Sequence, residues 1–519
     1  MSDAITRAGG FAAVPRAVGA REVTDDPVAA CLEPGTTVVV ACGGFEDLRD
    51  LAALARTMGV TLAVRPPPRP SPTSGGEEAA SPPPEVGEGR GGGRAILDAT
   101  RTAAALDAAV ATDASLPPLP SAPENSPTRI VEATIHRLAL PLRHLYVSAM
   151  YVTPKQDRTL VRLRLADGTV GWGETVGTPD CATLVASQAR SWLGRDALHD
   201  RAAMRRSLAR ITFENRHGRN GLAAHAALDL AAWDAAARHL GLPLRAMLRP
   251  DAPNRPVPVA CPLPAAVPGR PMTRAEITAH MADASRATRV ADLAVEIAAA
   301  HGITAFKYKS AGTGVVWDLA ALTALRARLG PAARLRCDPN AAYSTEEARE
   351  LVEATAPLSL EFHEDPTDGI EGLARLPPLA KLATNMCVIA PEHLAAAYRR
   401  GLRGLVVLAD IFYWGGIAPL RDAAAAARLL GLTPALHSFY ESAVATAANL
   451  HLAQALELDD PHPMDCGTTS LAEDVVAPGT LTVTDGALRG PDGPGLGLAP
   501  DPARLAALAI AEPVVIRAA

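Results

Sequence analysis

The sequence lacks several features that would place it in other classes of protein. Its seven cysteines are scattered and odd in number, and none forms a Cys-x-x-Cys pair, so neither a disulfide framework nor a zinc knuckle is indicated. No apolar run approaches the roughly 18 residues that a membrane span needs. The N-terminus also lacks a charged-then-apolar signal pattern. We therefore expect a cytoplasmic protein that has no membrane partner.

Basic clusters are also missing, and the formal net charge is −6. Because nucleic-acid-binding domains gather Lys and Arg on one face, no nucleic-acid partner is expected. What is present is an ordinary soluble composition, with 48% hydrophobic and 20% charged residues. A chain of 519 residues exceeds one average domain, so several domains are expected.

Residues 1–127 are predicted to form an N-terminal appendage. A strand at Thr37–Ala41, a turn at Gly43–Gly44, a helix at Phe45–Met58 and a strand at Thr61–Val64 would make a small βαβ unit. The stretches that follow are rich in Pro, Gly and Ser, which predicts linkers. The glycine pair lacks a full Gly-x-Gly-x-x-Gly pattern, so a structural or docking role is favoured over a nucleotide site.

Residues 128–255 are predicted to form an α+β domain, because a meander of alternating strands is followed by a block of helices. The predicted strands and the turn between them are Arg129–Leu138, Thr159–Leu165, Asp167–Gly168 and Thr169–Glu174. The predicted helices are Cys181–Leu193, Asp200–Ile211 and Gly221–Leu240.

From residue 256 to 478, short apolar strands alternate with amphipathic helices, which predicts a closed parallel barrel. The fold class is therefore α/β, a modified (β/α)8-type barrel written (β/α)7β, capped by the α+β domain. Residues 479–519 contain a predicted hairpin and helix, expected to return to the α+β domain. The predicted barrel strands are Val257–Pro262, Ala305–Lys309, Arg334–Asn340, Ser359–Asp365, Leu382–Met386, Gly404–Ile411, Thr433–Ser438 and Pro463–Cys466.

Six consecutive predicted strands end in polar residues, spaced 21 to 29 residues apart along the chain. In barrels of this kind the catalytic groups lie at the C-terminal ends of the strands. Polar residues on a solvent-exposed surface are not expected to recur at the end of every strand. These residues are Lys307 and Lys309, Asp338 and Asn340, Glu364 and Asp365, Asn385, Asp410, and His437.

Three of these residues suit a metal ion. Asp338, Glu364 and Asn385 offer hard oxygen donors on adjacent strands, the ligand type that Mg²⁺ prefers. A divalent ion there would hold a substrate carboxylate and stabilise the enediolate formed when its α-proton leaves.

Possible bases stand on either side of these ligands. Lys309, beside Lys307 and a dication, is expected to have a lowered pKa and to accept a proton near neutrality. Asp410 and His437 are expected to pair, the carboxylate fixing the imidazole tautomer. Once protonated, such a pair can deliver a proton to a leaving hydroxide.

Each residue also has a plain structural interpretation. Asp338–Asn340 and Glu364–Pro366 are ordinary turn sequences, and the two lysines could simply be solvated. Asn385 and His437 could be buried and hydrogen-bonded, and Asp410 could cap a helix. If all of these residues had only structural roles, their recurrence at the ends of six consecutive strands would be a coincidence. The functional interpretation is therefore favoured.

The same residues resemble the enolase superfamily, and Asn385 within Ala-Thr-Asn-Met resembles its glucarate dehydratase-like branch. The resemblance runs from about Thr128 to Leu508. It rests on Phe306-Lys-Tyr-Lys309, Cys337-Asp-Pro-Asn340, His363-Glu-Asp-Pro366, Ala383-Thr-Asn-Met386, Ala409-Asp410, Leu436-His-Ser438, Gly171-Trp-Gly-Glu174 and Pro494-Gly-Leu-Gly497.

The resemblance implies opposed bases, Lys309 and the Asp410–His437 dyad, with electrostatic help from Lys307 and Asn340. It implies Mg²⁺ as the cofactor, a small-molecule carboxylic acid as the substrate and a homo-oligomeric assembly. The implied reaction is β-elimination of water from an acid sugar or related hydroxy acid. Implied substrate contacts are Arg143, His144 and Tyr146 after the first strand, Arg216–Asn220 in a polar loop, and Tyr440 and Glu441 after His437.

Two departures keep other functions open. Phe439-Tyr-Glu441 follows the histidine in place of a longer polar stretch, which favours a less hydroxylated substrate. Residues 1–127 have no counterpart in the family, so a specialised biosynthetic lyase is an alternative. A racemase or epimerase on the same scaffold is another, since bases on both faces can invert a stereocentre. A non-enzymatic scaffold is disfavoured by the complete set of polar residues.

Overall fold

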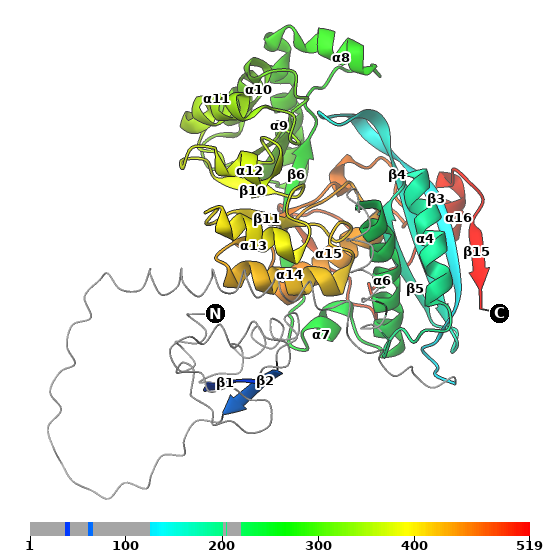
Figure 1. Cartoon of the computed structure of the whole chain (residues 1–519). Coiled ribbons are helices and arrows are strands. Elements are labelled where there is room, and N and C mark those ends of the chain that lie inside the picture. The colour runs from blue at the N-terminus through cyan, green and yellow to red at the C-terminus, as the bar shows by residue number, and fades with distance from the viewer. Residues whose placement is uncertain (1–36, 42–60, 66–124, 201–203, 205–218, 519) are drawn as a thin grey trace, which may run out of the picture. The chain divides into compact units, whose positions relative to one another are not determined.

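The computed structural model of the protein describes residues 37–41, 61–65, 125–200, 204 and 219–518 (Figure 1). They fall into two compact units. The smaller contains the parallel pair β1 (Thr37–Ala41) and β2 (Thr61–Arg65), and it also includes residues 391–401 and 425–431. Both strands match the sequence prediction. The predicted Gly43–Gly44 turn and the helix over 45–58 lie outside the described residues.

The larger unit begins with an antiparallel sheet in the order β15-β3-β4-β5. Its strands are β3 (Ile130–Val147), β4 (Val152–Leu165), β5 (Val170–Val176) and β15 (Val514–Arg517). The first two are much longer than predicted. β3 continues through Pro141, which precedes a shift in register, where proline is tolerated.

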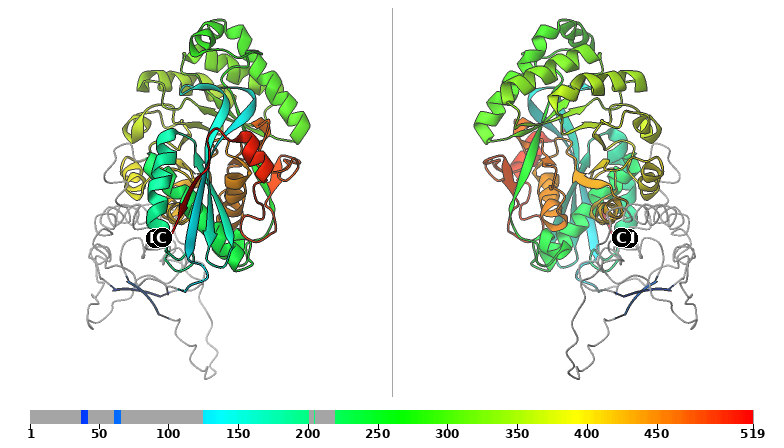
Figure 2. Two further views of the ribbon diagram at one scale, coloured as in Figure 1. Left: turned by 90° about the vertical axis from the view of Figure 1, so that its right-hand side faces the viewer. Right: turned by 90° about the vertical axis from the view of Figure 1, so that its left-hand side faces the viewer.

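Two helices pack on this sheet, α4 (Pro179–Trp192) and α6 (Arg219–His239) (Figure 2). The close approach of α6 explains two glycines of β5. A Cβ at Gly171 would lie 2.1 Å from the Ala231 carbonyl oxygen, and one at Gly173 would lie 1.9 Å from that of Ala227. The Gly-Trp-Gly motif is therefore a packing requirement for this helix. The helix predicted at 200–211 lies largely outside the described residues.

Eight parallel strands then form the barrel, in chain order with the last strand beside the first. All eight were predicted; β7, β8 and β9 end on Lys309, Asp338 and Glu364, whereas Asn385, Asp410 and His437 lie just beyond the ends of their strands. They are β6 (Pro256–Leu263), β7 (Ala305–Lys309), β8 (Arg334–Asp338), β9 (Phe362–Glu364), β10 (Leu382–Thr384), β11 (Val406–Ala409), β12 (Thr433–Leu436) and β13 (Met464–Asp465).

Helices alternate with these strands along the chain. Capping boxes begin two of them, at Thr273 with Glu276 and at Ser344 with Glu347. The helices are α7 (Leu244–Leu248), α8 (Arg274–Met281), α9 (Thr288–His301), α10 (Val315–Leu329), α11 (Thr345–Thr355), α12 (Gly369–Ala374), α13 (Pro391–Arg399), α14 (Ile417–Leu429), α15 (Ala443–Leu456) and α16 (Pro502–Leu508), with 3-10 turns at Ala284–Ala287, Ala356–Leu358 and Thr468–Ser470.

The C-terminal segment joins both parts of the larger unit. After a tight turn, β14 (Ala487–Arg489) pairs antiparallel with β6, and β15 pairs antiparallel with β3. Asp234 of α6 accepts backbone hydrogen bonds from Leu496 at 2.7 Å and from Trp172 at 2.8 Å. Gly495 has φ +67° and would place a Cβ 2.0 Å from the Asp234 carboxylate, so the Pro-Gly-Leu-Gly motif fits this contact.

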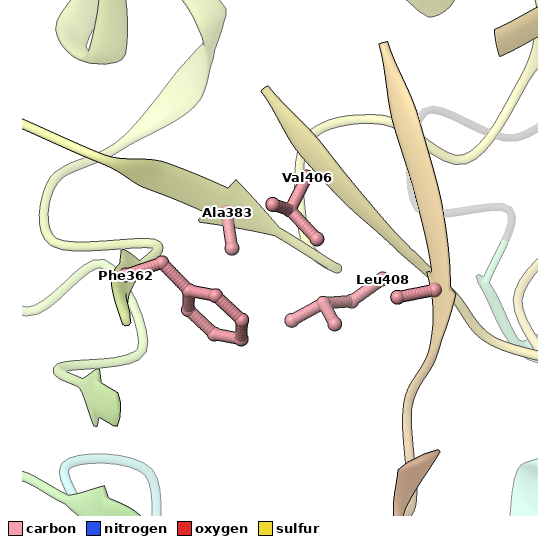
Figure 3. Packing of buried hydrophobic residues seen from close by; sticks show 5 residues of the cluster. Phe362, Ala383, Val406 and Leu408 are labelled. Atoms are coloured by element: carbon pink, nitrogen blue, oxygen red, sulfur yellow. The ribbon is translucent and has the colours of Figure 1, made fainter. Parts of the chain in front are cut away.

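One half of the barrel interior is apolar. Phe362, Ala383, Val406 and Leu408 point toward one another and form a buried cluster with Ala435 (Figure 3). Each belongs to a strand between β9 and β12. Among the residues that the structure describes, no helix combines the length and apolarity needed to cross a membrane.

Candidate active site

The alternation of side chains along the barrel strands places the predicted polar residues inside the barrel mouth. The cluster residues Ala383, Leu408 and Ala435 face the interior, and Asn385, Asp410 and His437 each follow two positions later. Phe362 and Glu364 are related in the same way. All of these polar side chains are buried.

Carboxylates and lysines alternate across the neighbouring strands. Lys309 is paired in register with Asp338 on the adjacent strand, and its ammonium contacts that carboxylate. Lys307 lies deeper, 2.9 Å from a Glu364 oxygen and in contact with Asp465. Asn340 donates from its backbone and its side chain, each at 2.9 Å, to one oxygen of Asp338. These contacts fix two of the three predicted metal ligands, Asp338 and Glu364.

The donor set fits a divalent cation. Asp338, Glu364 and His437 each offer an atom, and these atoms lie within 4.8 Å of one another. The side-chain oxygen of Asn385 is buried and has no hydrogen-bond partner among the described residues. Two carboxylates and a free amide oxygen at the end of adjacent strands are the ligands that Mg²⁺ prefers. His437 is nearer to this group than the sequence suggested.

His437 stands between the predicted ligands and its predicted partner. Its Nε2 is 3.4 Å from Glu364 and 3.2 Å from the Asn385 amide nitrogen. Its Nδ1 is 3.6 Å from Asp410, so the two form a close pair at a distance longer than a hydrogen bond. The other Asp410 oxygen accepts from the backbone of Phe412 at 2.7 Å, so Asp410 holds the turn after β11, whereas α14 begins only at Ile417.

Burial perturbs the proton affinities of the site. It lowers the pKa of His437 well below its ordinary value, and the charges of Lys307 and Lys309 lower it further. Burial raises the pKa of Asp410 to about 7. Burial alone lowers the pKa of Lys309, but Asp338 and other neighbours raise it well above its ordinary value. The neighbouring carboxylates therefore outweigh burial in the protein alone, and the lowered pKa that the sequence predicts beside a dication stays a prediction.

A cavity of about 480 Å³ opens above these groups. Lys309, Asn340, Asn385 and His437 form its floor, and the tip of the β3–β4 hairpin forms one side. This tip is held to the barrel by the Ala149 N–H, which donates to the Ser310 carbonyl at 2.7 Å. The remaining lining comes from the β3–β4 hairpin, the end of β5 and the start of α4, the start of α6, and the loops after β10, β11 and β12: Tyr146, Met150, Tyr151, Thr153, Lys155, Gln156, Asp157, Arg158, Val176, Gly177, Thr178, Pro179, Arg219, Asn220, Met386, Tyr413, Ser438, Phe439 and Tyr440.

The predicted substrate contacts divide into two groups. Tyr146, Tyr440 and the Arg219–Asn220 part of the polar loop line this cavity, whereas residues 216–218 lie outside the described part of the chain. Arg143 and His144 instead line a second cavity of about 480 Å³. Both lie within β3, and their predicted contact with the substrate stays a prediction.

Glu441 also lies outside the described lining of the site cavity. Its carboxylate accepts from Ser438 at 2.8 Å, from the Phe439 N–H at 2.7 Å and from Asn449 at 3.0 Å. These bonds shape the loop that follows His437. Glu441 thus has a structural role in this loop, and its predicted contact with the substrate stays a prediction.

Sequence reasoning missed the link between the capping sheet and the site loop. Glu174 of β5 is fully buried and accepts from the Ser442 N–H at 2.8 Å and from the Ala445 N–H at 3.0 Å, at the start of α15. Arg158 lies 3.5 Å from the same carboxylate. Burial raises the pKa of Glu174 to about 7. The Gly171-Trp-Gly-Glu174 motif identified Glu174 in the sequence, but a sequence does not show which helix its carboxylate contacts.

Buried charges beneath the floor were missed as well. Asp465 contacts Lys307, and its other oxygen accepts from Arg336 at 2.7 Å. Arg336 also lies 2.7 Å from Glu361 and above the Phe362 ring. Arg336 is fully buried and precedes Asp338 by two positions, so strand alternation was a signal that could have found it.

Two comparisons by sequence bear on this site. Residues 130–248 match the mandelate racemase / muconate lactonizing enzyme N-terminal domain, and residues 289–504 match the enolase C-terminal domain-like family. The chain is 30% identical over 372 residues to a probable glucarate dehydratase from Streptomyces coelicolor, covering 68% of this chain and 85% of that protein. It is 28% identical over 390 residues to an L-Lys-D/L-Arg epimerase from Methylococcus capsulatus, covering 71% and 99%.

A solved structure agrees with the fold. An enolase from Thermobispora bispora, complexed with magnesium and formate, matches with a TM-score of 0.62 and 31% identity. The match covers 73% of this chain and 92% of that one.

Proposed function

The chain belongs to the enolase superfamily, and from this premise we propose that it removes the proton next to a carboxylate and then expels a β-hydroxyl as water. The substrate would be an acid sugar or a related hydroxy acid. The similarity to a probable glucarate dehydratase supports this choice within the family. Oxygen donors of Asp338, Glu364 and Asn385 would hold Mg²⁺, as magnesium accompanies the related Thermobispora bispora enolase.

The observation that carries the proposal is the placement of two proton-transfer groups beside one set of oxygen donors. Lys309 contacts Asp338, and His437 lies 3.4 Å from Glu364. Both line the same cavity, so a carboxylate held at the donors would place its α-carbon within reach of either group.

His437 is the group prepared to accept the proton. Burial and the two lysines favour its neutral form, and Asp410 at 3.6 Å stabilises the imidazolium that results. As the α C–H bond breaks, its electron pair moves toward the carboxylate, where a bound Mg²⁺ supplies the charge that stabilises it. The pair then returns to form the C–C double bond while the β C–O bond breaks. A protonated Lys309 or His437 delivers the proton that turns the leaving hydroxide into water.

An epimerase is the second candidate, and the same geometry supports it. Bases on two sides of one α-carbon allow a proton to leave from one face and return on the other. The similarity to an L-Lys-D/L-Arg epimerase also supports it. Incubation in D₂O separates the two reactions, since epimerisation gives α-deuteration with the carbon skeleton retained and dehydration gives a keto acid.

A screen of mono- and diacid sugars with Mg²⁺, read by keto-acid formation and by loss of the α-proton NMR signal, tests the proposal. Lys309→Ala and His437→Asn should each abolish turnover, and each should lose α-exchange for one configuration of the substrate. The exposed positions Lys381→Ala and His199→Asn serve as matched controls and should behave as the unaltered protein does. Full activity in both site variants would refute the mechanism.

A further inference from the structure

A buried carboxylate that the proposed mechanism does not use lies behind the candidate site. Asp318, in the first turn of α10, is fully buried. Its two oxygens accept from two tyrosine hydroxyls, that of Tyr308 at 2.8 Å and that of Tyr343 at 2.8 Å. Both tyrosines belong to segments that carry site residues, so Asp318 is a link between these segments.

Tyr308 connects this carboxylate to the proton-transfer lysine. It lies between Lys307 and Lys309 on β7, and successive side chains of a strand point to opposite faces. The two lysines therefore face the barrel interior, whereas the Tyr308 ring points outward to α10. Because the Tyr308 hydroxyl is bonded to Asp318, the end of β7 cannot rotate or slide without breaking this bond. The position of the Lys309 ammonium against Asp338 depends on it.

Tyr343 connects the same carboxylate to the next two strands. It lies in the loop that follows Asp338, and it forms an isolated parallel bridge with Thr367, in the loop that follows Glu364. Its hydroxyl also lies 3.4 Å from the hydroxyl of Ser310. One carboxylate thus joins the ends of β7, β8 and β9.

The same turn of α10 holds the loops on which the capping hairpin rests. The Trp317 indole N–H donates to the Ala265 carbonyl at 2.9 Å, and the Ala265 N–H donates to the Val147 carbonyl of the hairpin at 2.8 Å. The Ala149 N–H of the hairpin tip donates at 2.7 Å to the carbonyl of Ser310, which directly follows β7. This hairpin forms one side of the site cavity. The first turn of α10 therefore fixes this side of the cavity and the end of β7 together.

We propose that Asp318 is a positioning residue, which fixes Lys309 and the capping hairpin relative to the oxygen donors without touching the substrate. The inference rests on the proposed proton abstraction for the role of Lys309. The hydrogen bonds described for Asp318 lead to β7 and to the loop after β8, whereas His437 follows β12. Loss of this carboxylate should therefore impair proton transfer at Lys309 more than proton transfer at His437.

Asp318→Asn tests this assignment, because the amide keeps one acceptor oxygen and replaces the other by an N–H donor, so that one tyrosine hydroxyl loses its acceptor. Exchange of the α-proton with Mg²⁺ in D₂O is followed separately for D- and L-tartrate, whose α-carbons have opposite configurations. Since a displacement of about 1 Å can cost about 10²-fold in rate, the enantiomer that depends on Lys309 should exchange about 10²-fold more slowly. The enantiomer that depends on His437 should slow by a much smaller factor. Equal losses for both enantiomers, or no loss for either, would overturn the assignment.

Hydrogen exchange of the Ala149 amide supplies a readout that needs no substrate. In Asp318→Asn this amide should exchange at least about 10-fold faster than in the unaltered protein, because its acceptor loop is less firmly held. Tyr308→Phe removes a single hydroxyl and should shift both readouts in the same direction, which decides the matter if Asp318→Asn folds poorly. An Ala149 amide that exchanges at the unaltered rate in the folded variants would refute the inference.

Asp459→Asn is the matched control. Asp459 is also a buried carboxylate, but it pairs at 2.6 Å with Arg255, before β6 and at the opposite end of the barrel. The control should lower the melting temperature and leave both the ratio of the two tartrate exchange rates and the Ala149 amide unchanged. A change in the control as large as that in Asp318→Asn would assign the effect to general destabilisation and refute the inference.

The outcomes also separate this inference from the proposed function. If the unaltered protein exchanges neither tartrate enantiomer, the proposed proton abstraction fails for this acid, and the Ala149 amide alone decides whether Asp318 fixes the hairpin. If tartrate exchanges but Asp318→Asn alters neither readout, the proposed function stands and the inference is wrong.

Discussion

Replacing Gly173 by alanine should damage both the stability and the activity of the protein. A Cβ at this position would lie 1.9 Å from the Ala227 carbonyl oxygen and 2.8 Å from the Ala231 nitrogen, both in the backbone of α6. Ordinary contact begins near 3.4 Å, so helix and strand must separate by about 1.5 Å. Overpacking of this kind costs about 1–3 kcal/mol. For a domain of this size, the melting temperature should fall by roughly 2–12 °C.

Activity should also fall, because α6 and β5 both carry residues that line or support the candidate site. The first turn of α6 brings Arg219 and Asn220 to the site cavity, and the strand residue after Gly173 is Glu174, which holds the start of α15. A displacement of about 1 Å at a reacting centre can cost about 10²-fold in rate. We expect kcat/KM to fall by about that factor, and Mg²⁺ binding to change little.

Gly490→Ala is the matched control for this experiment. Its Cβ would meet the end of the buried Gln454 side chain at 3.3 Å and no helix backbone, so it should lower the melting temperature and kcat/KM much less than Gly173→Ala does. Differential scanning calorimetry and steady-state kinetics on both variants measure the difference. If Gly173→Ala melts and turns over as Gly490→Ala does, the packing explanation of the Gly-Trp-Gly motif is refuted.

Three further predictions concern charge. Asp465→Asn should destabilise the protein by about 3–5 kcal/mol in urea unfolding, because Lys307 and Arg336 each lose a buried carboxylate. The control Asp292→Asn removes an exposed ion pair with Arg328 and should cost under about 1 kcal/mol. Burial raises the pKa of Glu174 to about 7. Between about pH 4.5 and 7, Glu174 is therefore protonated in the folded state and ionised in the unfolded state, so the free energy of unfolding should fall as the pH rises through this range. Glu174→Gln should flatten that part of the pH profile of the melting temperature, and an unchanged slope would contradict the assignment. Chelation of Mg²⁺ should abolish α-exchange and lower the melting temperature, and saturating Mg²⁺ at about 100 times its Kd should restore about 2.7 kcal/mol; a melting temperature indifferent to Mg²⁺ would argue against the site.

The barrel was predictable from the sequence because its signals are local. Short apolar runs alternate with helical segments, and six consecutive runs end in polar residues. The strand at Ala305–Lys309 has the predicted bounds. Strand alternation then dictates that Lys309, Asp338 and Glu364 share the interior, so the sequence predicts their proximity without any knowledge of the helices between them.

The parts that were missed depend on contacts between distant segments. The sequence did not place Arg143 and His144 at a second cavity, because the course of a hairpin is set by its docking. The bond from Ala149 to Ser310 is one of the contacts that fix it. The partner of Glu174 was hidden for the same reason, since nearly 270 residues separate it from Ser442.

The interior beneath the site explains why its two proton-transfer groups differ. Beneath Asp410 and His437, two positions earlier on the same strands, stand Leu408 and Ala435, which belong to the apolar cluster. These side chains offer no charge to solvate the pair, and burial raises the pKa of Asp410 to about 7 while it lowers that of His437.

The opposite side of the barrel has an ionic floor. Two positions before Lys309 stands Lys307, which contacts Asp465, and Asp465 in turn contacts Arg336, two positions before Asp338. On this side the pKa of Lys309 is raised by Asp338, against the effect of burial. Burial and the charges of Lys307 and Lys309 thus prepare His437 to accept a proton, whereas the adjacent Asp338 leads Lys309 to hold one. It follows that exchanging an apolar floor residue for a charged one should alter the proton chemistry of the site without touching the substrate.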